Sequence, residues 1–588
     1  ASAALEPSAD PAVEVMEHTA TVAVQLMSGN QHGVYAVPIS TTVLSLKAMI
    51  HRSGGVVAGI SVRNLRLAWE EDIMEDKRTL AELGFSTAET NTVTLVVTNE
   101  NHLQTILRLQ PPIPARRART PLEGKPQMTF QVNKEGARVD VDTDEQYPTR
   151  RDFHFDFIGD TDLSQQELYD VNVAPLVEAA VQGYNSTVYV WGTTSSGKRY
   201  TTFGPDVMSA AWRAEPFPRE APPPSSALEN MGFLPRAFET IASKVEELKK
   251  VGPPEEVKLH VNFLELRHNV QLVDLLAGLA KETDSPCESQ QAKPEAGRGE
   301  AQAGFATAAE AAAAAAKPAP AKPAIVKVRE HPKLGLYLEG ALPIEAHSLA
   351  ELQDILMTGL HSSCKYHLSL GGTVGRRAYV FSVCIEVPCS ESGTEAKCRT
   401  GRFSAVVLPG LHDLIRSSVS LGSQLTHGML DLRIVQAFTT ILHALAEQTF
   451  LPDRPKPNRR FIPYRDCVLT WLLRDTLGGH GRTAFIFTAD EASYQGHTGE
   501  AMLKLLRIAD RIGHTTNKEA HPVTWNEEEV ALGASQSSAS QDHTPSTSAL
   551  PQPQQAAVGG QGEGLLQQQE QQQQQEGQQQ QQQQQQQQ

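Results

Sequence analysis

The sequence predicts an α/β protein, and three observations support this fold class. The apolar stretch TVYVW (187–191) has the composition of a buried strand. It runs directly into the glycine-rich segment GTTSSGKR (192–199), which fits the phosphate-binding pattern G-x-x-x-x-G-K-[ST] except at its last position. A helix is expected on each side of this unit: SQQE (164–167) has capping-box spacing, and a helical stretch should follow the loop. This order is the strand–loop–helix context of a P-loop domain.

Composition limits the classes of protein that the chain can belong to. Its 588 residues are enough for two or three domains, and its net charge of -16 argues against nucleic acid as a partner. No run of 18 apolar residues is present, so no membrane span is expected, and the N-terminus ASAALEPSAD does not read as a signal peptide. The six cysteines form no C-x-x-C pair, which predicts reduced thiols, a cytoplasmic location and no metal site.

Residues 20–98 predict a small α+β module after a loose segment at 1–19. Strands are expected at 21–27 and 33–39, joined by the turn SGN into a hairpin. A helix should begin at Thr41 or Thr42 and end at the glycines 54 and 55. Two more strands, LRLAW (65–69) and TVTLVV (92–97), complete the module.

This module resembles ubiquitin in its order of elements and in the segment DKRTLAELGF (76–85). The resemblance implies a folded interaction module and not a conjugated tag, because the last strand runs into TNENHL without the terminal Gly-Gly. Ala68 stands where the family has the isoleucine of its apolar recognition patch, so different receptors are expected. The protein partner of the module is left open.

The second block spans residues 102–517 and contains one compositional break. Residues 281–325 are rich in alanine and proline, which predicts a disordered surface insertion. Residues 527–588 end in a glutamine tract, which cannot bury enough apolar surface to fold and favours self-association.

Five segments of this block stand out, in this order along the chain: FHFDFIGDTDLSQQELYDVNVAPLVEAAVQGYNSTVYVWGTTSSGKRYTTFG (153–204), GFLPRAFETI (232–241), VNFLELRHNVQLVDLL (261–276), IPYRDCVLTWLLRDTLGGHGRTAFIF (462–487) and LLRIADRI (505–512). Together they resemble the kinesin motor domain, in the family's order. The resemblance implies a P-loop domain with a central, mostly parallel sheet and helices on both faces. It also implies binding to microtubules and a cytoskeletal location.

The nucleotide loop keeps only part of the family's chemistry. Lys198 could still face a phosphate, but Arg199 replaces the hydroxyl that ligates magnesium, and a guanidinium repels a cation. Ser195 replaces a glycine. Two interpretations follow: the loop only joins strand to helix, or it binds ATP or ADP without normal magnesium coordination, with Arg199 as a substitute cation. The candidate nucleotide-binding residues are Gly192, Thr193, Thr194, Ser195, Ser196, Gly197, Lys198 and Arg199, with Arg108 and Pro111 from the adenine segment RLQP, in which Gln110 replaces an arginine.

Both switch segments of the family are altered. In the first, Val374 and Gly375 stand at the serine positions and Arg376 is kept. In the second, Val407 replaces the aspartate and His412 replaces the glutamate, while Gly410 is kept. Arg376 and His412 cannot form the family's closing ion pair; His412 is either an ordinary residue or, less simply, a substitute base.

The sequence therefore predicts a kinesin fold without competent ATP turnover, a pseudo-motor with no catalytic residues. Each lost group would by itself lower the rate by about 10². Such a protein would act as a scaffold on a microtubule assembly such as the ciliary axoneme. Two alternatives are an atypical motor with weak turnover, permitted by Lys198, and a ubiquitin-pathway adaptor led by residues 20–98.

Microtubule contacts are expected from basic residues near the segment IPYRD. Tyr464, Arg465 and Arg474 are the candidates, while Val468 and Trp471 stand where the family has a lysine and an arginine. The run RPKPNRR (454–460) is either a further basic patch or a solvated loop. No heptad pattern follows residue 515, so a two-headed walker is not expected.

Overall fold

The computed structural model describes much of residues 19–526. Of the segments expected to be disordered, 1–19, 281–325 and 527–588, all residues lie outside the described ones except Thr19 and Ile325, which begin β1 (Thr19–Leu26) and β15 (Ile325–His331). Within 19–526 the undescribed residues are 55–56, 58–59, 70–71, 99–100, 111–127, 135, 144–149, 194–195, 219–228, 252–256, 268–270, 278–324, 332–334, 342, 370–377, 390–396, 412–423, 451–460 and 491–498.

The N-terminal module is a five-stranded mixed sheet with one long helix, as its hairpin–helix–strand pattern predicted. The strand order is β2-β1-β5-β3-β4; β1 and β5 are parallel and the other pairs antiparallel. Val22, Leu46, Leu67 and Val93 lie in its core. The elements are β1 Thr19–Leu26, β2 Gln31–Pro38, α1 Val43–Arg52, the 3₁₀ turn η2 Val62–Asn64, β3 Leu65–Trp69, β4 Asp72–Ile73, α2 Leu80–Leu83 and β5 Thr90–Val97.

Capping residues set the ends of these helices. Thr42 caps α1 by accepting a hydrogen bond from Ser45 N, which settles the choice between Thr41 and Thr42. Gly54 follows the helix with φ +73°. Thr79 and Glu82 form a reciprocal capping box at α2, inside the DKRTLAELGF segment.

A twelve-stranded sheet forms the centre of the second block. Its strand order is β11-β7-β20-β12-β19-β18-β13-β14-β15-β16, with β17 beside β13 and β22 beside β19. The strands are β7 Gln104–Gln110, β11 Phe157–Gly159, β12 Asn185–Gly192, β13 Lys258–Arg267, β14 Gln271–Asp274, β15 Ile325–His331, β16 Gly335–Glu339, β17 Ile344–Ala346, β18 Ala378–Cys389, β19 Lys397–Val407, β20 Arg482–Asp490 and β22 Val523–Asn526.

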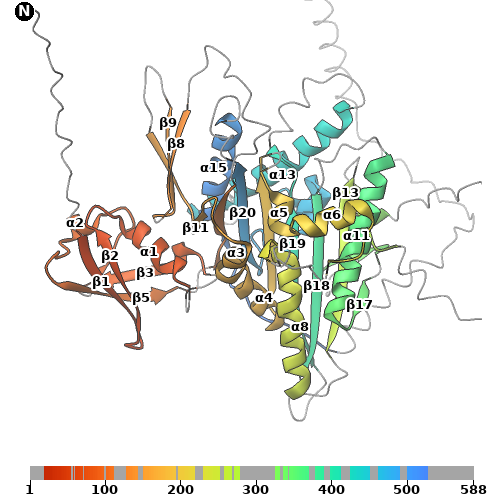
Figure 1. The fold of residues 1–588 in the computed structure, drawn as a ribbon, viewed down its shortest axis with the longest axis horizontal. Helices are drawn as coiled ribbons and strands as arrows, with labels where there is room; N and C mark the ends of the chain where they lie inside the picture. Colours follow the sequence, from red (N-terminus) through yellow and green to blue (C-terminus); the bar gives the residue numbers. More distant parts are fainter. Residues whose placement is uncertain are drawn as a thin grey trace, which may run out of the picture. The chain divides into compact units, whose positions relative to one another are not determined.

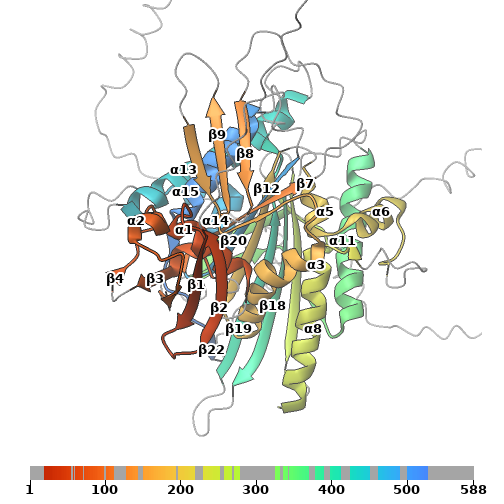
Figure 2. The ribbon, with the colours of Figure 1, turned by 60° about the vertical axis from the view of Figure 1, so that its left-hand side comes forward.

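The expectation of a mostly parallel sheet is wrong for half of this sheet. The pairs from β11 to β19 are parallel, whereas every pair from β19 through β18 to β16 is antiparallel. Strand β12 lies in the parallel half and is buried on both faces, which explains its continuous apolar sequence. The neighbouring strands of the parallel half appear side by side in Figure 2.

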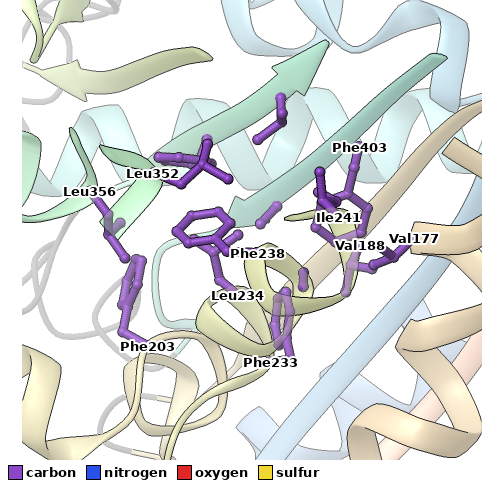
Figure 3. Packing of buried hydrophobic residues seen from close by; sticks show 14 of the residues in the cluster. Val177, Val188, Phe203, Phe233, Leu234, Phe238, Ile241, Leu352, Leu356 and Phe403 are labelled. Carbon is purple, nitrogen blue, oxygen red and sulfur yellow. The ribbon is translucent and has the colours of Figure 1, made fainter. Parts of the chain in front are cut away.

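Helices cover both faces of the sheet, as expected. One core cluster contains residues of α4, α6, α8 and α11, and a second contains residues of α13, α14 and α15. Figure 1 shows the long helices α8 and α11 beside the sheet, and Figure 3 shows Ile241 of α8 next to Val188 of β12 and Phe403 of β19. The helical elements are α3 Gln165–Leu168, the π turn η4 Tyr169–Val173, α4 Ala174–Val181, α5 Lys198–Thr202, α6 Pro205–Arg213, α8 Phe233–Val251, α11 Leu349–Ser369, α13 Gln424–Phe450, η7 Tyr464–Asp466, α14 Val468–Leu472, η8 Arg474–Thr476 and α15 Gly499–Gly513.

Two smaller strand groups complete the described residues. Strands β8 Met128–Asn133, β9 Arg138–Thr143 and β10 Arg150–His154 form an antiparallel sheet, and β6 Asn101–His102 pairs with β21 Thr516–Asn517. Strand β22 pairs with β19, so the central sheet includes residues beyond 517, where the second block was predicted to end. None of the described helices combines the length and the apolar character needed to cross a membrane.

Candidate nucleotide site

The strand–loop–helix unit forms as predicted, with β12 leading into α5. Gly197 precedes the helix with φ +90°, a conformation that suits glycine. Gly192 lies so close to β20 that an added Cβ would meet the Thr488 carbonyl oxygen at 2.2 Å. Both glycines are therefore required by the chain's own packing at this corner.

Among the described residues of the loop, Thr193, Ser196 and Lys198 are hydrogen-bonded to one another. The Lys198 ammonium donates to the carbonyl oxygen of Thr193 at 2.7 Å, and it lies 3.5 Å from the carbonyl oxygen of Gly192. The buried Ser196 hydroxyl donates to the Thr193 carbonyl at 2.7 Å and lies 2.6 Å from the Thr488 hydroxyl. In this arrangement the lysine charge is directed at backbone carbonyls of its own loop.

Arg108, the retained residue of the adenine segment, is withdrawn into the core. Its side chain is 3% exposed and donates to Gln165 Oε1 at 2.6 Å and to Thr201 Oγ1 at 3.1 Å. Its guanidinium carbon lies 5.1 Å from the centre of the Tyr200 ring. Burial lowers the pKa of Arg108 to about 10, so the group is still charged near pH 7. A guanidinium held by these partners is not presented as a platform for a base.

Gln110, the substituted residue of the same segment, packs against the loop. An added Cβ on Gly197 would lie 2.0 Å from Gln110 Nε2. Strand β7 ends at Gln110, so its side chain reaches the loop from the neighbouring strand end. The substitution therefore places an amide directly beside the glycine that opens α5.

The start of the second switch is apolar and buried. Val407 ends β19, is 3% exposed and belongs to the core on the α8 side of the sheet. The next residue, Leu408, donates its backbone N–H to the Val190 carbonyl at 2.9 Å and so continues the pairing with β12. Gly410 is buried close behind. At this strand end, Val407 places an apolar side chain where the kinesin pattern has a carboxylate.

Several predicted site residues lie outside the described residues, and Arg199 lies half-buried on α5. The undescribed predicted residues are Pro111, Thr194, Ser195, Val374, Gly375, Arg376 and His412.

The residues present do not fit a magnesium ion beside a nucleotide. At the two described positions where the kinesin pattern supplies a hydroxyl and a carboxylate, this chain has Arg199 and Val407. Magnesium requires oxygen ligands in octahedral geometry, and neither side chain has one. In the described part of the chain, no three His, Cys, Asp or Glu side chains lie close enough together to hold a metal ion.

The arginines predicted to face a microtubule are both paired within the chain. Glu330 of β15 accepts from Arg465 at 3.1 Å and from Arg474 at 2.8 Å, and the Arg465 guanidinium lies over the Trp471 ring. These hydrogen bonds and charges lower the pKa of the Glu330 carboxyl. The Tyr464 hydroxyl donates to the Leu477 carbonyl, and burial raises its pKa to about 12. The positive charge predicted for this surface is thus partly neutralised by Glu330.

The residues that bind the predicted site residues have no signal of their own in the local sequence, with one exception. Gln165 and Tyr200 hold Arg108, Thr488 closes the loop, and Glu330 binds the two arginines. The exception is Gln110, whose place in the segment RLQP differs visibly from the arginine of the family pattern. The other contacts join residues far apart in the chain, which no local pattern specifies.

Comparison with known proteins identifies the second block. A family model described as the kinesin motor domain matches residues 112–514. The human kinesin-like protein KIF13B is 24% identical over 344 residues, which are 58% of this chain and 15% of the relative. The kinesin-like protein KIN-5B of Oryza sativa subsp. japonica is 26% identical over 366 residues, which are 62% of this chain and 29% of the relative. The chain thus spans less than a third of the length of these relatives.

Solved structures agree at the level of the fold. A chain of the KIF14 dimer in complex with a microtubule matches with a TM-score of 0.51 and 22% identity, covering 74% of this chain and 98% of the other. A fast kinesin matches with a TM-score of 0.52 and 20% identity, covering 72% and 95%. The match to the family model over most of the chain, together with this fold, shows that the protein belongs to the kinesin motor-domain family.

Proposed function

We propose that this protein is a catalytically inactive, kinesin-like scaffold that binds a microtubule assembly without turning over ATP. This proposal rests on the loop 192–199 together with Arg108 and Val407, a group of residues called the nucleotide corner from here on. The Lys198 ammonium is bonded to its own loop, Arg108 is buried, and Val407 replaces a carboxylate. A site without metal ligands lacks the charge neutralisation on which phosphoryl transfer depends.

Microtubule binding is proposed from the family and not from a strong basic surface. The net charge of -16 and the pairing of Arg465 and Arg474 with Glu330 both weaken attraction to an acidic polymer. We therefore expect binding of modest affinity that does not cycle with nucleotide. A stationary component of the ciliary axoneme fits this behaviour.

The N-terminal module supplies the second half of the scaffold in this proposal. Its strand order and the capped α2 within DKRTLAELGF support the proposed ubiquitin-like fold. On β3, Ala68 is half-buried, and Ile73 of the adjoining β4 is 67% exposed. This surface differs from the ubiquitin pattern, so we propose that it recruits a different protein partner.

The test measures nucleotide content, ATPase rate and microtubule cosedimentation of the full chain. We expect no stimulation of ATPase by microtubules above a no-enzyme background, and cosedimentation that ATP and Mg²⁺ leave unchanged. The proposal fails if microtubules stimulate turnover and Lys198→Ala abolishes it while Lys250→Ala, on the exposed side of α8, does not. That outcome would establish the alternative of an atypical motor, which the retained lysine permits.

A further inference from the structure

Helix α15 has one buried face and one basic face. Met502, Leu505, Leu506, Ala509 and Ile512 are buried in the sheet-facing core. The intervening positions Lys504, Arg507 and Arg511 are exposed, at spacings of three and four residues that place them on one side of the helix. The outer face of α15 is thus a row of cations on a chain whose net charge is -16.

Strand β10 packs against this helix and adds a third arginine. Arg151, Arg507 and Arg511 line a hollow of about 530 Å³, together with Asp152, Asp510 and the nearly buried ring of Phe153. None of the three guanidinium groups has a hydrogen-bond or ion-pair partner among the residues that the structure describes. Other exposed arginines, such as Arg213 and Arg329, are paired with carboxylates.

The two carboxylates of the hollow face histidines. Asp152 lies 3.6 Å from His154 Nδ1, and Asp510 lies 3.5 Å from His514 Nδ1. The nearest described carboxylates are therefore not engaged with the arginines. The arrangement leaves three guanidinium forks, each able to bind a carboxylate through two parallel hydrogen bonds.

We propose that the hollow between β10 and α15 is a docking site for an acidic, extended peptide segment of a partner protein. Charge complementarity favours this partner, because the rest of an acidic chain repels polyanions and this surface attracts them. Asp152 and Asp510 also line the hollow, so we expect a ligand with separate carboxylates to be repelled less than a continuous phosphate backbone. This site is distinct from the nucleotide corner and does not depend on the proposed function.

The test uses fluorescence anisotropy with the full chain and a fluorescein-labelled oligoglutamate peptide at low salt. The site variant carries Arg151→Gln, Arg507→Gln and Arg511→Gln. The control variant carries Arg213→Gln, Arg329→Gln and Arg465→Gln, which changes the net charge equally but removes arginines that already have carboxylate partners. Circular dichroism checks that both variants are folded.

We expect the wild-type chain to bind the peptide, the site variant to lose at least about tenfold in affinity, and the control to change by less than about twofold. Added salt should weaken the wild-type binding. Equal losses in both variants would mean that only net charge matters, and absence of wild-type binding would likewise overturn the proposal. Equally tight binding of a labelled single-stranded RNA, lost in the site variant, would reassign the surface to nucleic acid.

Discussion

Replacing Glu265 by glutamine perturbs a buried carboxylate of the motor domain that accepts hydrogen bonds through both of its oxygens. Glu265 lies on β13 and is 0% exposed. One of its oxygens accepts from Ser363 at 2.8 Å and from His367 at 2.8 Å, both on α11. The other accepts from Arg267 at 2.6 Å. The carboxylate therefore ties α11 to the central sheet, at the end of the helix that leads to the first switch.

The pKa of Glu265 gives the expected size of the effect. Burial by itself raises this pKa, but the hydrogen bond from His367 and the charge of Arg267 outweigh it and lower the pKa from 4.5 to about 2. This difference corresponds to about 3 kcal/mol of folding free energy. Because glutamine has no charge and presents a donor to Arg267, Glu265→Gln should lose about that much stability near pH 7.

Urea unfolding followed by tryptophan fluorescence, to which Trp191 in the same sheet contributes, measures this loss. The matched control is Glu386→Gln, which removes a partly exposed carboxylate 3.4 Å from His260 on the adjoining strand and should cost less than about 1 kcal/mol. A lowered folded-state pKa means that the contribution of Glu265 is complete above pH about 4.5 and is lost as the pH falls towards 2. The stability gap between wild type and variant should therefore narrow only in that acidic window. A gap below about 1 kcal/mol at pH 7, or one that narrows near neutral pH, would refute this account of the network.

Three further substitutions test the nucleotide corner and the microtubule face. Glu330→Gln should release Arg465 and leave Arg474 with only its 3.6 Å contact to Asp475, and so raise microtubule affinity about twofold in cosedimentation, since exposed ion pairs contribute little. Unchanged affinity would show that these arginines do not face the polymer. Gly197→Ala should destabilise the chain by about 1–3 kcal/mol in urea, because it strains a φ of +90° and drives a Cβ into Gln110; a neutral result would contradict the packing at the loop. Val407→Asp should lower the free energy of unfolding by about 3 kcal/mol because it buries an unpaired carboxylate, and the variant should show no ATPase activity. Measurable ATP turnover would mean that the loss of this one carboxylate accounts for the inactivity.

Local sequence patterns predicted the elements around the site well because short-range interactions specify them. The apolar run of β12 marks a strand buried on both faces. Ser164, the first residue of the SQQE segment, caps α3 by accepting a hydrogen bond from Glu167 N. Such signals need only a few neighbouring residues, so they can be read without the fold.

The antiparallel half of the sheet was not predictable in the same way. Strand direction depends on how distant segments pair, and β13 lies beside β18, more than a hundred residues later in the chain. The π turn at Tyr169–Val173 also lacked a local signal, because an ordinary helix fits the same apolar spacing.

By itself, the sequence determined that this is a kinesin-family chain whose nucleotide loop lacks a hydroxyl at residue 199, because residue identity is independent of conformation. Only the tertiary structure decided where the remaining charges are directed. The Arg108 side chain is buried in the core, and the Lys198 ammonium donates to a carbonyl of its own loop. The Glu330 carboxylate binds two arginines that lie more than a hundred residues later in the chain. A buried or paired charge takes its energy from the groups around it, and those groups are brought together only when the chain folds.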